Sequence, residues 1–316
     1  MPSKAEQVSN TQYPIPNLIV IVGPTAVGKT ALAIGLAQCF DGEIVSADSR
    51  QIYRGMDIGT AKPTREEKAA VLHHLIDIVE PDEPYTLANY QADAYAAIDG
   101  ILARGKQPFL VGGTGLYVRA VVEGLRIPRV PPNKKLRAKL EREDGVVLYE
   151  RLHALDPDAA ARIDPRNVRR TIRAIEVCLT TGERFSELGK TLPPPYRITQ
   201  IGLTLGRSEL YARIDARVDR MMEQGLVAEV ESLVAKGYNW SLPSMSGLGY
   251  REIGECLRDE VSLDEAVINI KRHTRGFVRR QYAWFRLRDE RIRWFENAQV
   301  HDIAQWLETV KRQVSR

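Results

Sequence analysis

The sequence predicts a doubly wound α/β fold, with a mainly parallel sheet, helices on both of its faces and an inserted helical domain. Three observations indicate this architecture. A glycine-rich segment joins the first apolar run to a helical stretch, short β-branched runs alternate with helical patterns up to residue 126, and no convincing strand lies between residues 127 and 196. A chain of 316 residues is long enough for one large domain with such an insertion.

Composition indicates the setting of the protein. The formal net charge is +4. Cys39, Cys178 and Cys256 are far apart with no C-x-x-C pair, which indicates a reducing compartment and argues against a structural zinc site. Residues 1–16 are polar and are expected to form a disordered lead-in, and the apolar run after them is too short to span a membrane. We expect a soluble, cytoplasmic protein without membrane contact that acts as a monomer.

Residues 23–30 (GPTAVGKT) fit the phosphate-binding pattern G-x-x-x-x-G-K-[ST], the P-loop. They follow the apolar run 17–22 and precede good helix formers at 31–37, which is the strand, loop and helix context that the motif requires. Gly23 and Gly28 let backbone N–H groups approach anionic oxygens closely. The predicted cradle for a di- or triphosphate consists of Gly23, Pro24, Thr25, Ala26, Val27, Gly28, Lys29 and Thr30.

Two side chains of the cradle have roles of their own. The start of the helix contributes a partial positive charge, and Lys29 adds a full one. The hydroxyl of Thr30 can hold a Mg²⁺ ion, as the last residue of this motif does.

Three further runs, at residues 43–48, 74–79 and 108–113, are predicted to be buried parallel strands. A helical stretch at 85–104 separates the last two and ends at Gly105. Parallel strands place their carboxyl ends on one rim, where the ligands of doubly wound sheets bind. The P-loop is therefore expected to share a rim with the segments that follow these strands.

Asp48 and the turn 112–114 (GGT) lie at this rim. A carboxylate after a strand is often only a turn or cap residue. Beside a phosphate cradle, however, Asp48 can accept a proton from a weak nucleophile that attacks the phosphate-bearing substrate. Ser49 and Gln51 can read polar edges of the nucleophile, and Thr114 can donate a hydrogen bond into the same space.

The usual machinery for hydrolysing a nucleoside triphosphate is missing from these segments. In P-loop hydrolases a later strand ends in an aspartate that orders Mg²⁺, whereas the strand at 109–111 ends in Gly-Gly-Thr. Asp77 could partner a metal, although its predicted place inside a strand is equally consistent with a structural role. We infer that the bound phosphates leave the substrate as one unit.

The chain divides where its composition changes. Prolines at positions 128, 131 and 132 open the middle segment, and prolines at 193–195 close it. The predicted parts are the first core segment 17–126, the helical insertion 127–196 and the second core segment 197–316. We expect insertion helices over 134–143, 147–154 and 168–180, later strands over 200–205 and 292–295, and later helices over 263–287 and 300–314.

Several segments resemble the tRNA dimethylallyltransferase family, also called the tRNA isopentenyltransferases. In the first core segment the resemblance is carried by the P-loop and by the runs 48–53, 57–63 and 112–117, of which the run beginning at residue 48 is especially specific. The resemblance spans roughly residues 17 to 290, and no zinc finger follows the core, as in bacterial members. The later matching segments are 170–177, 249–251, 274–275, 280–281 and 284–286.

The resemblance implies a prenyltransferase. It would move the dimethylallyl group from dimethylallyl diphosphate to N6 of adenine 37, next to the tRNA anticodon, and release diphosphate. The P-loop would hold the diphosphate with Mg²⁺ at Thr30, and Arg279 and Arg280 of the long helix would add positive charge. Asp48 would take a proton from the poorly nucleophilic amine, with Thr114 beside it as the second catalytic residue. The adenine must leave its stack to reach such a pocket.

Basic residues indicate where the tRNA would bind. One arginine stripe is expected on the insertion, around Arg170, and another on the long helix, around Arg275. A single stripe is often a solvated surface, but two of them suit a phosphate clamp on the anticodon stem-loop. The residues expected to bind tRNA are Asp48, Ser49, Arg50, Gln51, Thr114, Arg169, Arg170, Arg173, Tyr250, Arg251 and Arg275.

Other functions could also use a P-loop of this kind. An adenylate isopentenyltransferase would act on free AMP or ATP, but a mononucleotide needs no helical insertion with arginines. A small-molecule kinase or a nucleotide-dependent RNA-binding switch would use the same loop, but the turn 112–114 argues against both.

Overall fold

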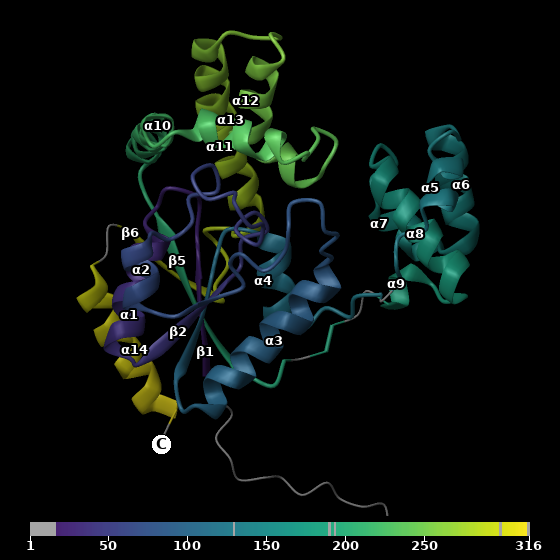
Figure 1. Ribbon diagram of the computed structural model, residues 1–316. Helices are drawn as coiled ribbons and strands as arrows, with labels where there is room; N and C mark the ends of the chain where they lie inside the picture. Colours follow the sequence, from purple (N-terminus) through teal and green to yellow (C-terminus); the bar gives the residue numbers. More distant parts are fainter. Residues whose placement is uncertain (1–16, 129, 189–190, 193, 297–298, 315–316) are drawn as a thin grey trace, which may run out of the picture.

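A six-stranded sheet forms the centre of the computed structural model, which describes residues 17–128, 130–188, 191–192, 194–296 and 299–314 (Figure 1). The strand order is β3-β2-β4-β1-β5-β6, and every neighbouring pair is parallel. This confirms the predicted doubly wound α/β fold. The predicted lead-in at 1–16 and Pro193 lie outside the described residues. The strands are β1 (Asn17–Val22), β2 (Gly42–Ser46), β3 (His73–His74), β4 (Gln107–Val111), β5 (Arg197–Thr204) and β6 (Ile292–Glu296).

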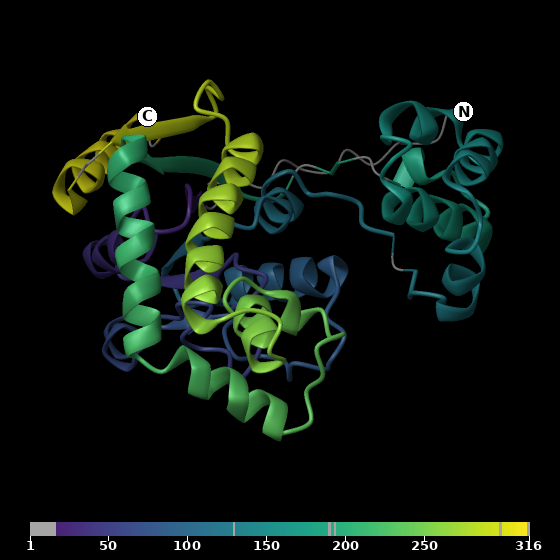
Figure 2. The same ribbon diagram turned by 90° about the horizontal axis from the view of Figure 1, so that it is seen from above.

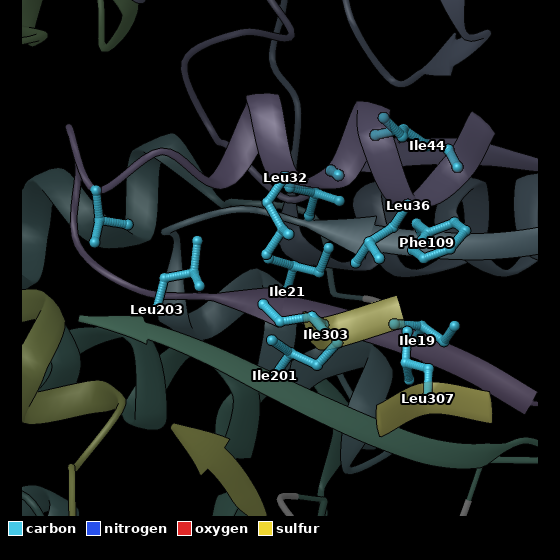
Figure 3. Packing of buried hydrophobic residues seen from close by; sticks show 14 of the residues in the cluster. Ile19, Ile21, Leu32, Leu36, Ile44, Phe109, Ile201, Leu203, Ile303 and Leu307 are labelled. Carbon is cyan, nitrogen blue, oxygen red and sulfur yellow. The ribbon is translucent and has the colours of Figure 1, made fainter. Parts of the chain in front are cut away.

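Helices cover both faces of the sheet. Side chains alternate along each strand, so Ile19 and Ile21 pack with α1 and α14 on one face (Figure 3), whereas Leu18 and Val20 pack with α3 and α4 on the other. Because both faces of β1 are buried, its sequence is a continuous apolar run. The helices of the core are α1 (Lys29–Cys39), α2 (Arg65–Ala70), α3 (Leu87–Ala103), α4 (Gly115–Val122) and α14 (Val300–Val314).

The predicted strand at 74–79 is wrong for most of its length. Strand β3 has only two residues, because Leu75 and Asp77 adopt left-handed backbone conformations, with φ of 62° and 58°, that end the extended run. The Asp77 carboxylate forms ion pairs with Lys62 and Lys68. The structure therefore gives Asp77 a structural role at the edge of the sheet.

The segment between α4 and β5 forms a bundle of helices beside the core (Figure 2). Leu140, Leu152 and Ile175 belong to an apolar cluster of its own. Its first two helices and α8 correspond to the three predicted ones, whereas α7 and α9 are too short to show a helical period in the sequence. We keep residues 127 and 196 as proposed boundaries. The bundle contains α5 (Lys134–Leu140), α6 (Gly145–Leu155), α7 (Pro157–Arg162), α8 (Val168–Thr181) and α9 (Phe185–Leu188).

The remaining helices form a cap over the carboxyl ends of the strands (Figure 1). Glu229 fastens this helical cap to the core, because its carboxylate accepts hydrogen bonds from the backbone N–H groups of residues 57–59 at 2.8–3.2 Å and from the Tyr250 hydroxyl at 2.6 Å. In the described part of the chain, no helix has the length and apolar character needed to cross a membrane. The cap contains α10 (Arg207–Glu223), α11 (Leu226–Ala235), the 3₁₀ turn Ser244–Ser246, α12 (Tyr250–Leu257) and α13 (Leu263–Trp284).

Candidate active site

A cavity of about 740 Å³ lies between the rim of the sheet and the helical cap. The P-loop, the residues after β2 and the turn after β4 bound it on the core side, and α10, α12 and α13 bound it on the other. The structure thus brings together the three segments that the sequence places on one rim. The predicted site residues that line the cavity are Thr25, Lys29, Thr30, Asp48, Ser49, Arg50, Gln51, Thr114, Tyr250, Arg251, Arg279 and Arg280.

The P-loop has the backbone geometry of an anion site. A Cβ on Gly23 would lie 2.5 Å from Leu203 O, and Gly28 has a φ of 101°, so both positions require glycine. Helix α1 begins at Lys29 without a side-chain cap, and its first N–H groups have no acceptor within the helix. The other predicted loop members do not line the cavity, and they are Gly23, Pro24, Ala26, Val27 and Gly28.

Two cations meet at this loop. The Nζ of Lys29 donates to Pro24 O at 2.7 Å. The Nη1 of Arg217 donates to Thr25 Oγ1 at 3.2 Å. Burial, together with the charge of Arg217, lowers the pKa of Lys29 to about 7, while Asp48 acts in the opposite direction. Burial also lowers the pKa of the Arg217 guanidinium. A bound diphosphate would add negative charge beside these two side chains.

Arg217 is absent from the sequence prediction, although a signal for it exists. It lies three residues after Ile214 and seven after Leu210, and both of these are buried residues of α10. That spacing places Arg217 on the apolar face of the helix. A charged residue on such a face is the pattern that could have identified it.

Asp48 and Thr114 follow the neighbouring strands β2 and β4. Asp48 Oδ1 accepts a backbone hydrogen bond at 2.8 Å within its own turn, and Thr114 Oγ1 accepts one from Ser49 N at 3.0 Å. A Cβ on Gly112 would lie 2.2 Å from Ala47 O, so glycine is what allows the two turns to approach. The carboxylate and the hydroxyl are therefore held on one short stretch of the rim.

Arg50 and Gln51 are engaged by protein partners. Arg50 Nη1 donates to Pro243 O at 2.5 Å, and Nη2 donates to Ser246 Oγ at 3.3 Å. Gln51 Nε2 donates to Ala61 O at 3.2 Å. Arg50 thus ties the rim to the helical cap, and Gln51 fixes the segment that follows β2.

The predicted arginines of α13 differ in their surroundings. Arg279 and Arg280 are exposed and line the cavity. Arg275 forms an ion pair with Asp215 and lies 5.4 Å over the ring of Tyr211, so it joins α13 to α10. The structure therefore places two of the three where they can reach a substrate in the cavity.

The three predicted arginines of the insertion lie on α8. Arg169 and Arg170 are exposed, whereas Arg173 pairs with the buried Glu176 at 2.6 Å and donates to Val130 O at 3.0 Å. Arg173 therefore belongs to the packing of the insertion. No described residue of the insertion lines the cavity.

Tyr250 and Arg251 lie in the wall that α12 forms. Tyr250 is 1% exposed, and its hydroxyl binds Glu229, so its ring packs inside the helical cap and is not available for stacking in this arrangement. Arg251 forms an ion pair with the buried Glu252 and contacts His273 Nδ1 at 3.0 Å.

Thr30, the predicted Mg²⁺ ligand, lines the cavity, as does Asp48. Among the described residues there is no group of three His, Cys, Asp or Glu side chains that could hold a metal by itself. This donor set fits a Mg²⁺ ion that is bound together with phosphate, because Mg²⁺ keeps several waters and uses few protein ligands at such sites.

Family models and curated relatives match most of this chain. The IPP transferase family model matches residues 51–288, and the isopentenyl transferase family model matches residues 16–76. A tRNA dimethylallyltransferase of Roseiflexus castenholzii is 60% identical and aligns with 85% of this chain and 89% of that protein. A tRNA dimethylallyltransferase of Thermomicrobium roseum is 50% identical and aligns with 95% of this chain and 91% of that protein.

Solved structures share the fold. The tRNA isopentenylpyrophosphate transferase of Bacillus halodurans has a TM-score of 0.72 and 40% identity, and the match covers 95% of this chain and 98% of that one. A eukaryotic dimethylallyltransferase acting on tRNA has a TM-score of 0.78 and 28% identity, over 94% of this chain and 77% of that one.

Proposed function

Because this chain belongs to the IPP transferase family, we propose that it transfers the dimethylallyl group from dimethylallyl diphosphate to N6 of adenine 37 in the tRNA anticodon loop. The bond between the allylic carbon and the diphosphate oxygen breaks, and a bond from that carbon to N6 forms. N6 gives up one proton, and diphosphate leaves. The reaction takes place in the cytoplasm, and the acting species is a monomer.

One observation carries this proposal: a phosphate cradle and a carboxylate share a single cavity. The P-loop lies at the end of β1, Asp48 follows β2, and the turn 112–114 follows β4, where a P-loop hydrolase would have an aspartate for its metal. Such a cavity is suited to holding a departing diphosphate while a base acts beside it.

The cations stabilise the leaving group. Negative charge grows on the diphosphate as the allylic bond breaks, and Lys29, Arg217 and the helix N-terminus already lie at the P-loop. Arg279 and Arg280 add charge from α13. One preorganised donor of this kind is typically worth about 3–4 kcal/mol in the transition state.

Asp48 acts as the general base. The N6 lone pair is delocalised into the adenine ring, so the amine becomes a useful nucleophile only as its proton is removed. A positioned base gives about 10²- to 10⁴-fold in rate. Thr114, on the adjoining turn, supplies a hydroxyl for orienting the flipped base.

Thr30 would hold Mg²⁺ together with the phosphates, and the ion would neutralise part of their charge. The anticodon stem-loop would be held by Arg169 and Arg170 of the insertion, with Ser49, Gln51 and Arg251 near the base. The structural contacts of Arg50, Tyr250 and Arg275 lead us to assign these three residues to bracing the site. Those of Arg173 assign it to the packing of the insertion.

The direct experiment offers labelled dimethylallyl diphosphate with either anticodon stem-loop RNA or AMP. Label is expected in the RNA at N6 of adenine 37, and only when Mg²⁺ is present. Label in AMP alone would support an adenylate isopentenyltransferase and contradict the proposal.

Asp48→Asn tests the base. We expect kcat to fall by about 10²- to 10⁴-fold, because the amide cannot accept the proton, while stem-loop affinity stays near that of the wild type. Single-turnover kinetics and filter binding measure the two quantities. A variant with wild-type kcat would show that the proton leaves by another route.

A further inference from the structure

Gln281 accepts a hydrogen bond from one of the backbone N–H groups of the P-loop. This side chain of α13 is 3% exposed, and its Oε1 accepts a hydrogen bond from the backbone N–H of Thr25 at 2.8 Å. Its Nε2 donates to Gly113 O at 3.1 Å. The glutamine therefore joins the P-loop after β1 to the turn after the neighbouring strand β4.

The space around this glutamine is closely filled. A Cβ on Gly113 would lie 2.2 Å from Gln281 Nε2, so glycine at that position makes room for the amide. The hydroxyl of Thr25 is also taken, by Nη1 of Arg217. The backbone N–H and the side-chain hydroxyl of Thr25 are thus both engaged by helices of the cap.

The two ends of the P-loop consequently differ. At the helix end, the first N–H groups of α1 have no intrahelical acceptor, and no side chain caps them. At the Thr25 end, the backbone N–H of Thr25 already donates to Gln281. A P-loop holds phosphates through its backbone N–H groups, so a donor that is withdrawn at one end shortens the row of phosphates that the loop can hold.

We propose that Gln281 is a specificity-determining residue that closes the Thr25 end of the cradle and limits the loop to a diphosphate. This inference rests on the proposed function and explains how the site selects an allylic diphosphate against nucleoside triphosphates. A third phosphate would have to displace Gln281, which would leave Gly113 O without a donor in a buried place, where a lost hydrogen bond is costly. A diphosphate at the helix end requires no such exchange.

The test measures how well inorganic pyrophosphate and inorganic tripolyphosphate, both with Mg²⁺, displace labelled dimethylallyl diphosphate. We expect the wild type to prefer pyrophosphate. Gln281→Ala should lower that preference about tenfold, the change expected from one hydrogen bond, mainly because tripolyphosphate binds more tightly. Gln281→Met keeps the length of the side chain but cannot accept from Thr25 N, and it should shift the preference in the same direction.

Gln91→Ala is the matched control. Gln91 Nε2 also donates to two backbone carbonyls, Ala120 O at 2.6 Å and Leu125 O at 2.9 Å, but Gln91 does not line the cavity. Its replacement removes a similar glutamine bridge from elsewhere in the core. The preference between the two polyphosphates should stay at the wild-type value.

Two results would overturn the role of Gln281. The first is that the wild-type protein binds tripolyphosphate as tightly as pyrophosphate. This result would contradict the proposal even if no Gln281 variant folds. The other is an unchanged preference in a folded Gln281 variant. Transfer of label to RNA is measured in parallel. If the wild-type protein still transfers label to RNA and binds pyrophosphate, such a result contradicts only the role of Gln281. If it does neither, the proposed function is contradicted as well.

Discussion

At the scale of single residues, Lys29 shows a charge that depends on the ligand. Burial beside Arg217 lowers its pKa to about 7 in the free protein. A bound diphosphate places negative charge next to the amine and favours its protonated form. Above pH 7 we therefore expect ligand binding to shift the lysine from its neutral toward its protonated form.

Pyrophosphate binding at about pH 8 is accordingly expected to take up protons through Lys29. The sign follows from a pKa that lies near 7 in the free state and rises on binding. Lys29→Arg is the control, because a guanidinium keeps its charge in both states. Calorimetry in buffers of different ionisation enthalpy should show greater proton uptake for the wild type, with an affinity that falls as the pH rises above 7. Equal uptake by both proteins would contradict this account.

Gly23 lies at a position where a Cβ atom would destabilise the fold. Its φ of 143° and the 2.5 Å approach of Leu203 O to an ideal Cβ leave no place for alanine. Gly23→Ala should lower the free energy of unfolding by about 1–3 kcal/mol. Gly100→Ala, in α3 and with its nearest neighbouring atom at 3.5 Å, should instead raise it by about 0.5–1 kcal/mol. Urea denaturation distinguishes the two, and a neutral Gly23→Ala would show that the loop can relax.

At the scale of elements, α8 presents charge on the insertion while the cavity lies in the core. Arg169 and Arg170 are exposed on this helix, and Arg173 is used in its packing. Contacts from α8 to RNA phosphates would raise affinity without touching the chemistry, because phosphate contacts position a nucleic acid and base contacts specify it.

Replacing Arg169 and Arg170 together by alanine should therefore weaken stem-loop binding and reduce its dependence on salt. Two lost phosphate contacts would lower the slope of log affinity against log salt by about 1.4–1.8. Pyrophosphate binding should not change. Lys106→Ala is the control, since Lys106 precedes β4 at the opposite end of the strands and pairs with Asp41. An unchanged salt dependence in the double variant would place the RNA on another surface.

At the scale of the whole molecule, the sequence predicts the elements that are buried on two faces. The apolar runs of β1 and β4 are visible because both faces of these strands are covered. Prediction fails at the β3 edge of the sheet, where this strand has two residues and Asp77 turns away into ion pairs with lysines. It succeeds at the other edge, where β6 matches the predicted strand at 292–295. It also fails for α7 and α9, which are shorter than two helical turns.

Some residues of the site can also be predicted from the sequence, and others cannot. Asp48 and the turn 112–114 are predictable, because each directly follows a strand and parallel strands end together. Arg217 and the contact of Gln281 with Thr25 come from helices that pack over the rim. The local pattern of a helix shows that it packs, but it does not show which loop lies beneath it, so those two partners appear only in the folded structure.

The insertion leaves the core through two segments that are joined to each other. Leu192 N donates to Gly124 O at 2.8 Å, and Leu125 pairs with Thr191. A domain that is connected by one linker can rotate about many axes. A domain that is connected by two linkers bonded to each other rotates mainly about one axis. We therefore expect the insertion to rotate mainly about an axis through these two joined segments.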